Sequence, residues 1–180
     1  MNARISLALL IVAQLLLSSD ISVLTYNIHA LSPIIAGDDP HSRIIKILDN
    51  SQSYDLIFIQ ENWIFQHSDL KSKLPNHNLI ISNESKFVWP LSTWINSNGS
   101  GLTIAISDKY EIIDSHEEKF NTCSGWLLKA NDCLSSKGFQ HIKIKIDDQR
   151  IDIYNTHLDA GNSSVDIATR EKQISHIVNY

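Results

Sequence analysis

The sequence predicts one α/β (α+β) domain, in which helices cover mostly antiparallel sheets. Two observations carry this prediction. A strand, a helix and a second strand follow one another over residues 21–62, which is how a layered α/β unit begins. Residues 142–157 then alternate apolar and polar side chains on both sides of Asp147-Asp148-Gln149, which predicts an antiparallel hairpin. The length of 180 residues suits one domain, and the apolar fraction of 43% is ordinary.

The strand predicted over residues 151–157 has its candidate catalytic residues at its C-terminal end. Two isoleucines come first, and Asn155 and His157 follow where the strand stops ahead of Gly161. A buried strand is a rigid mount for a catalytic imidazole, and histidine gains or loses a proton near neutral pH. The alternative is a core histidine that is bonded to the backbone.

Two earlier strands end in the same way. Residues 21–29 are apolar until Asn27, and residues 55–62 form an apolar run that stops at Glu61. A carboxylate in this position is costly to bury unless it is paired or binds a metal ion. Because strands joined by a single helix usually lie side by side, we expect Asn27 and Glu61 to meet at one rim of the sheet, beside His157. Their oxygens suit a hard divalent cation, and the alternative for Glu61 is a solvated or ion-paired strand end.

Helix boundaries are marked by capping residues. Asp39-Pro40 predicts the start of a helix that ends near Asn50, because Asp caps free amides and Pro fits the first turn. Ser163 with Asp166 three residues later predicts a second start. We expect one side of that second helix to be its apolar face, formed by Ile167, Ile174, Ile177 and Val178.

The middle of the chain gives weaker signals. Residues 69–74 predict a short helix that stops before a proline, and residues 102–106 predict a strand paired with residues 110–115. Residues 87–95 are rich in aromatic side chains. They are either a loop packed on the edge of the sheet or a lipid-facing surface, because Trp and Phe favour interfaces.

The chain has two cysteines, Cys123 and Cys133, in one polar loop. They predict a disulfide if the protein is exported. The alternative is a pair of metal ligands, which lacks both the usual short spacing and a second pair.

Residues 1–19 predict a secretory signal peptide, with Arg4 ahead of an apolar stretch over residues 5–17 and small residues at Ser18-Ser19. The alternative is a membrane anchor, for which the stretch is short. The remaining domain is residues 20–180, and we expect it to be extracellular or periplasmic.

Net charge limits the choice of partner. The chain carries a formal charge of −5 and has four arginines, which argues against a broad nucleic-acid-binding face. This charge is compatible with a nuclease that contacts only a few phosphates.

Four motifs in order resemble the endonuclease/exonuclease/phosphatase (DNase I-like) superfamily. They are Thr25-Tyr26-Asn27, Gln60-Glu61, Ser100-Gly101-Leu102 and Asn155-Thr156-His157-Leu158. Members include DNase I-like nucleases, inositol-phosphate phosphatases and neutral sphingomyelinases. Lys137-Gly138-Phe139 ahead of a strand is most similar to the sphingomyelinase-type branch, and the resemblance covers about residues 21–180.

The resemblance implies a four-layer αββα sandwich of two mostly antiparallel sheets with outer helices. It implies a Mg²⁺-dependent phosphodiesterase in which Glu61, with Asn27 beside it, binds the metal. His157 would contact the scissile phosphate or protonate the leaving oxygen. A phospholipid headgroup is then favoured over nucleic acid as the phosphodiester substrate, with contact to a membrane surface.

The family pattern is incomplete in these residues. Members also carry a Gly-Asp-x-Asn strand and a final Asp-His pair, which hold the nucleophilic water, the phosphate and the general base. Neither occurs here, so we expect the sandwich to be incomplete on its C-terminal side and the activity of these residues alone to be very low. The rival expectations are an extracellular DNase I-like endonuclease and an inactive remnant that only binds.

Overall fold

The computed structural model describes residues 20–31, 33, 37–65, 67–82, 99–125 and 132–180. The predicted signal peptide over residues 1–19 and the aromatic segment over residues 87–95 lie outside the described residues.

In order along the described chain, the elements are β1 (Val23–Ala30), α3 (Pro40–Asp49), β2 (Leu56–Asn62), α4 (His67–Lys73), β3 (His77–Ile81), β4 (Thr103–Ser107), β5 (Glu111–Lys119), the 3₁₀ turn η1 (Asp132–Leu134), β6 (Gly138–Ile146), β7 (Gln149–Thr156) and α6 (Ser164–Val178). The first elements, β1, α3 and β2, follow one another as the sequence suggested.

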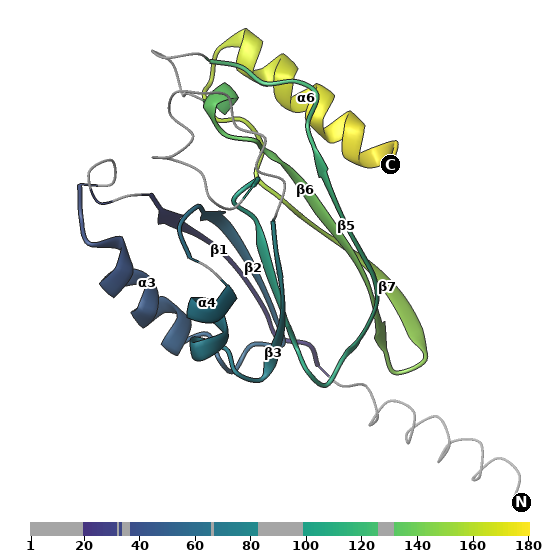
Figure 1. Ribbon diagram of the computed structural model, residues 1–180. Helices are drawn as coiled ribbons and strands as arrows, with labels where there is room; N and C mark the ends of the chain where they lie inside the picture. Colours follow the sequence, from purple (N-terminus) through teal and green to yellow (C-terminus); the bar gives the residue numbers. More distant parts are fainter. Residues whose placement is uncertain (1–19, 32, 34–36, 66, 83–98, 126–131) are drawn as a thin grey trace, which may run out of the picture.

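The strands form two sheets. Sheet A has the order β1-β2-β4-β3, and sheet B has the order β5-β6-β7 (Figure 1). Strands β1 and β2 are parallel, because α3 carries the chain back between them, and every other pairing is antiparallel. The prediction of two mostly antiparallel sheets in an α+β fold is confirmed.

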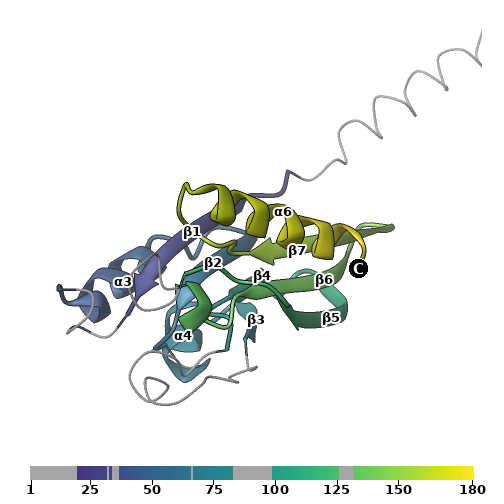
Figure 2. The same cartoon turned by 90° about the horizontal axis from the view of Figure 1, so that it is seen from above.

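The molecule is built in four layers. Helices α3 and α4 cover the outer face of sheet A, and α6 lies along the outer face of sheet B (Figure 1). Seen from above, sheet A stands between α3 and sheet B (Figure 2). One apolar core, which includes Ile28, Ile44 and Leu70, fills the space under the first two helices. A second core, which includes Phe58, Ile104 and Ile144, fills the space between the sheets.

Helix α3 begins where its capping residues predict. The side chain of Asp39 accepts hydrogen bonds from the backbone N–H of His41 (3.1 Å) and Ser42 (3.3 Å). Ile44 and Leu48 lie one turn apart and are fully buried. Capping and one apolar stripe therefore place α3 against sheet A.

One expectation for the middle of the chain, the pairing of residues 102–106 with residues 110–115, is wrong. Strand β4 does not pair with the segment that follows it, and β3, for which the sequence pattern gave no signal, occupies one side of β4 instead. Because β2 holds the other side, β4 has no free edge left. The turn at Tyr110 therefore carries the chain across to sheet B, where β5 pairs with β6.

The apolar side expected of the last helix does not face the core. Ile167, Ile174 and Val178 are 47%, 49% and 77% exposed, and Ile177 is partly buried. The buried residues of α6 are Thr169 and Gln173. The contact with sheet B is made by rings instead: His176 on α6 and Tyr180, which follows the helix, pack against Phe139. The polar side of the helix is turned inward because it hydrogen-bonds a loop, described below. None of the helices in the described residues is both long and apolar enough to cross a membrane.

The predicted disulfide between Cys123 and Cys133 is present, with the two Cα atoms 5.1 Å apart. Residues next to each cysteine bond to the segment after β7. The N–H of Ser124 donates to Asp159 (2.6 Å), and Asp132 accepts from the N–H of Ala160 (2.6 Å). The bridge therefore closes a loop that is fastened to the end of β7.

Removing this bridge should destabilise the fold. The double variant Cys123→Ser/Cys133→Ser should lose about 2–3 kcal/mol of unfolding free energy in the chain-entropy picture. Urea denaturation measures this loss, and a thiol reductant should produce a similar loss in the wild type and none in the double variant. Equal midpoints for the oxidised wild type and the double variant would contradict the prediction.

Helix α6 begins with the predicted capping box. The hydroxyl of Ser163 accepts from the N–H of Asp166 (3.3 Å), and Asp166 accepts from the N–H of Ser163 (2.9 Å). The hydrogen bond from the Ser163 hydroxyl, followed by those from the Ser163 backbone and the Ser124 hydroxyl, holds the pKa of Asp166 below its ordinary value of 3.8.

This depressed pKa gives a pH-dependent contribution to stability. The folded state holds the Asp166 proton less tightly than the unfolded state, so the stabilisation is complete above the unfolded pKa and is lost as pH falls through the folded pKa. The variant Asp166→Asn should be less stable than the wild type at pH 7, and the gap should close below about pH 4. Urea midpoints measured from pH 7 to pH 2.5 test this; a gap that stays constant would rule it out.

Candidate active site

Asn27 and Glu61 meet at one end of sheet A, as their strands predicted. The Asn27 Nδ2 donates a hydrogen bond of 2.7 Å to Glu61 Oε1. Asn27 lies near the end of β1 and is paired in register with Gln60, the residue before Glu61 on β2. The expected adjacency is confirmed, and the expected metal-binding role stays a prediction.

The backbone at Glu61 explains how this contact forms. Consecutive side chains of a strand point to opposite faces, so Glu61 would face away from Gln60 and from Asn27 in regular β structure. Glu61 instead has φ of 59°, in the left-handed region that residues other than glycine seldom adopt. This turn brings its carboxylate back to the amide of Asn27.

The amide of Asn27 is held in place from its other side. Its Oδ1 accepts a hydrogen bond from the N–H of His29 (2.9 Å), which also has a left-handed φ of 47°. The Arg43 guanidinium on α3 donates to the carbonyl oxygens of Ile28 (2.6 Å) and His29 (3.2 Å). Helix α3 thus supports the irregular end of β1, where the pairing with β2 shifts register.

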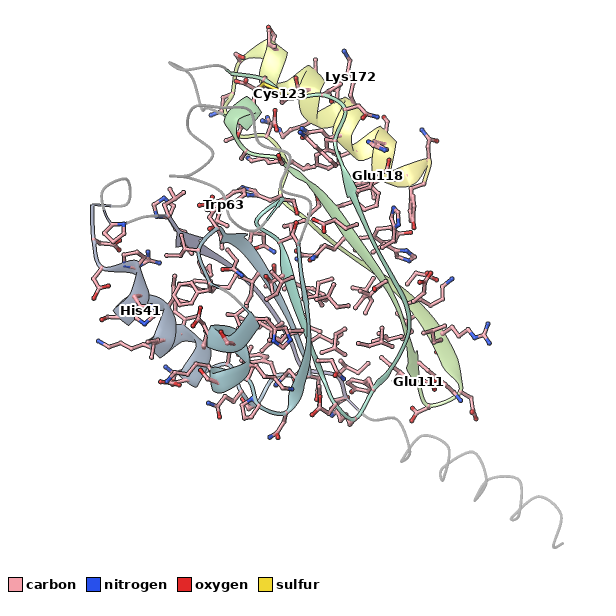
Figure 3. All side chains as sticks on the ribbon, viewed as in Figure 1. His41, Trp63, Glu111, Glu118, Cys123 and Lys172 are labelled. Atoms are coloured by element: carbon pink, nitrogen blue, oxygen red, sulfur yellow. A yellow bond between two sulfur atoms is a disulfide. The ribbon has the colours of Figure 1, made fainter. Side chains whose placement is uncertain are left out.

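The Ser100-Gly101-Leu102 motif lies under the same end of β2. The carbonyl oxygen of Gly101 accepts from the N–H of Asn62 (2.8 Å). Gly101 has φ of +70°, and a Cβ there would come within 2.7 Å of the Trp63 ring. Only glycine fits this close approach. Trp63 lies toward the same end of the molecule as Cys123, whereas Glu111 lies at the opposite end (Figure 3).

His157 follows β7 directly and completes the group. Its Nε2 lies 3.8 Å from Glu61 Oε1, and the two side chains are 24% and 18% exposed. Its Nδ1 is buried and has no hydrogen-bond partner among the described residues. Three strands therefore bring the three sequence-predicted residues, Asn27, Glu61 and His157, to one rim.

The surroundings of His157 keep its imidazole neutral. Burial is the main cause that lowers the pKa of His157 below its ordinary value of 6.5, and the nearby Lys137 cation lowers it further. Glu61, Asp132 and Asp159 act in the opposite direction and do not cancel the shift. At neutral pH the ring can donate one hydrogen bond and accept one.

A buried ion pair beside His157 was not foreseen from the sequence. Lys137 Nζ lies 2.6 Å from Asp132 Oδ1 and donates to the carbonyl oxygen of Leu158 (2.9 Å), the residue after His157. The side chains of Lys137 and Asp132 are only 6% and 5% exposed. The position of Asp132 next to Cys133 was the available signal, because the disulfide fixes that part of the loop.

The side chain of Asn155 hydrogen-bonds groups other than His157. Its amide points between the sheets and bonds Gln60, Gln140 and two backbone carbonyls. His29 and His41, which also lie near the first strand in sequence, serve the local structure: His41 stacks on Phe65 with ring centroids 5.3 Å apart.

The residues at the rim fit a hard cation held mainly by one carboxylate. Magnesium in proteins is commonly bound by one or two carboxylates together with water and substrate phosphates. Glu61 supplies the carboxylate, and Oδ1 of Asn27 keeps a second lone pair beside its bond to His29. Within the described ranges, no group of three or more His, Cys, Asp or Glu side chains is arranged to hold a metal ion.

Sequence comparison finds curated relatives. A sphingomyelinase C from Bacillus cereus is 26% identical over 156 residues, which are 81% of this chain and 45% of the relative. The chain thus spans less than half the length of that relative. No family model matches the chain.

Solved structures share the fold at lower identity. A β-hairpin deletion mutant of beta toxin from Staphylococcus aureus matches with a TM-score of 0.69 and 18% identity, over 90% of this chain and 61% of the toxin. Sphingomyelinase C from Streptomyces griseocarneus matches with a TM-score of 0.66 and 19% identity, over 89% of this chain and 57% of the enzyme.

These similarities agree with the order of the motifs and with the two-sheet fold, and the residues that carry the motifs lie where the fold requires them. The chain has the two-sheet α+β fold of these solved structures and is similar in sequence to bacterial sphingomyelinases C.

Proposed function

We propose that this protein is a metal-dependent phosphodiester hydrolase that acts on a phospholipid headgroup, as a sphingomyelinase does. The observation that carries the proposal is the meeting of Asn27, Glu61 and His157 at one rim, from β1, β2 and the end of β7. A carboxylate, an amide oxygen and a neutral imidazole form a set that can bind a cation and a phosphate together.

Glu61 and Asn27 would hold the cation, and magnesium is the ion we propose. A bound divalent cation polarises a phosphoryl oxygen and offsets charge on the departing oxygen. A structure of a beta toxin variant from Staphylococcus aureus contains bound magnesium ions, which supports this choice. The left-handed backbone at Glu61 has a role here, because it aims the carboxylate at the site that Asn27 faces.

His157 would act on the substrate directly. Hydrolysis forms a bond from water oxygen to phosphorus and breaks the bond from phosphorus to the lipid oxygen, which takes up a proton. A neutral imidazole can donate a hydrogen bond to the phosphate or to that departing oxygen. The His157 side chain is 24% exposed at the rim, which supports this role because part of the ring is open to a substrate.

The charge of the protein favours a lipid over a nucleic acid. The net charge is −5, and the relatives found by sequence are sphingomyelinases. The rivals are an extracellular DNase I-like endonuclease and a remnant that binds without turnover. We further propose that the protein is secreted and works at a membrane surface, where its lipid substrate lies; the disulfide supports export.

A substrate comparison tests the reaction class. With protein in excess over substrate and Mg²⁺ present, sphingomyelin vesicles should release their phosphorylated headgroup, and duplex DNA should stay intact. EDTA should abolish the release. Cleavage of DNA with intact sphingomyelin would establish the nuclease, and cleavage of neither under any divalent cation would establish the binding remnant.

Substitutions at the rim should separate the two roles. His157→Ala should lower kcat by about 10²–10⁴-fold, the usual contribution of a positioned acid or base, with little change in stability because a rim residue leaves no core cavity. Glu61→Gln should lower both the rate and the affinity for Mg²⁺. Single-turnover rates, measured with protein in excess across a Mg²⁺ titration, check both effects.

Two surface residues provide matched controls. His67 on α4 and Glu111 on β5 are exposed, and Glu111 lies at the far end of the molecule (Figure 3). His67→Ala and Glu111→Gln should keep wild-type rates and Mg²⁺ affinity. An unimpaired His157→Ala variant would mean that this histidine is structural only.

A further inference from the structure

A hydrogen bond between a partly buried glutamine and a buried asparagine crosses from one sheet to the other just below the rim. Gln60 Nε2 on β2 donates to Asn155 Oδ1 on β7 at 2.8 Å, between residues 95 positions apart in sequence. Gln60 directly precedes Glu61, and Asn155 stands two residues before His157. The bridge therefore joins the two strands that carry the carboxylate and the imidazole.

Asn155 is also anchored to the backbone of the opposite sheet. Its Nδ2 donates to the carbonyl oxygens of Ile59 on β2 (3.3 Å) and Thr103 on β4 (3.2 Å), and to Gln140 Oε1 (3.3 Å). Asn155 is 3% exposed. Burying an amide is costly unless its polar atoms are satisfied, and here both ends are bonded.

The apolar core does not set the sheet separation at this end. The core between the sheets includes Phe58 on β2, which precedes the rim. It also includes Ile142 and Ile144 on β6, which pair with residues before Asn155 on β7. Beyond them, at the rim, Asn155 on β7 bonds both the Gln60 side chain and the Ile59 carbonyl oxygen on β2. Strand β7 is an edge strand of sheet B, so its end has no further strand to hold it.

We infer that Gln60 and Asn155 are positioning residues, which fix the distance between Glu61 and His157 across the gap between the two sheets. The inference rests on the proposed function, because it gives that distance a catalytic purpose. Neither amide has to touch the cation or the substrate. Gln60 acts through Glu61, which directly follows it, and Asn155 acts through His157, two residues further on. The 3.8 Å between Glu61 Oε1 and His157 Nε2 is the distance they set.

Isosteric apolar replacements test the bridge. Gln60→Met and Asn155→Leu keep side-chain volume and remove the hydrogen bond. Each should weaken Mg²⁺ binding, measured by titration calorimetry with the metal alone, by about tenfold, the lower range for loss of a supporting residue around a metal ligand. Gln60 is only partly buried, so Gln60→Met serves the test if Asn155→Leu does not fold.

Hydrogen exchange provides a readout that does not depend on metal or activity. Backbone amides in residues 59–63 and in residues 155–160 should exchange faster in either variant, because the bridge ties both strand ends. Ile144→Val is the matched control: it weakens the core between the sheets at the other end, and it should leave Mg²⁺ affinity and both segments unchanged after correction for global stability.

The double variant Gln60→Met/Asn155→Leu separates positioning from packing. Two apolar side chains facing each other should regain stability over Asn155→Leu, and Mg²⁺ affinity should stay about tenfold low. Recovery of both would show that the pair only fills space and would overturn the inference. The inference would also be overturned if the Gln60→Met variant showed unchanged hydrogen exchange at residues 155–160. If the wild type binds no Mg²⁺, the proposed function fails, and the exchange result alone decides the bridge.

Discussion

The contact between the two sheets changes character along its length, and the site depends on that change. In the part of the interface that begins at the β6–β7 turn, the contacting side chains are aliphatic and aromatic, and Ile104, Ile142 and Ile144 are fully buried. Near the ends of β2 and β7 it becomes an amide network around Asn155. Apolar contacts are non-directional, whereas amide hydrogen bonds fix both distance and angle. The part of the interface that lies under the reactive side chains is thus the part with directional bonds.

A second constraint is the backbone at Glu61. A regular strand would leave Gln60 facing sheet B and turn Glu61 to the helix side, so one strand end could not supply both the bridge and the carboxylate at the rim. The left-handed residue resolves this conflict, and such a conformation costs on the order of 1–3 kcal/mol outside glycine. Asn27 and the Arg43 contacts to β1 supply compensating hydrogen bonds at the neighbouring strand end.

Periodicity and capping were sufficient to predict the parts of the fold that are local. Helix α3, the β6–β7 hairpin and the capping box of α6 were all predicted from nearby residues, and the meeting of Asn27 with Glu61 followed from one crossover helix. The pairing of β4 was not predictable in this way, because it depends on which edges the distant strands β2 and β3 have already occupied. The bonds of Asn155 and the Lys137–Asp132 pair were missed for the same reason: their partners come together only when the two sheets and the disulfide loop pack.

The inverted orientation of α6 fits this picture. Gln173 hydrogen-bonds both the N–H and the carboxylate of Asp159. Arg170 donates to the carbonyl oxygens of Asp159 and Gly161. The inner face of the helix is therefore hydrogen-bonded to the loop that follows His157. An apolar inner face would bury more hydrocarbon but would leave the carbonyls and N–H groups of that loop without partners, at a cost comparable to a lost hydrogen bond for each. Satisfying the loop next to the imidazole therefore decides which side of α6 faces inward, and the exposure of Ile174 and Val178 is the consequence.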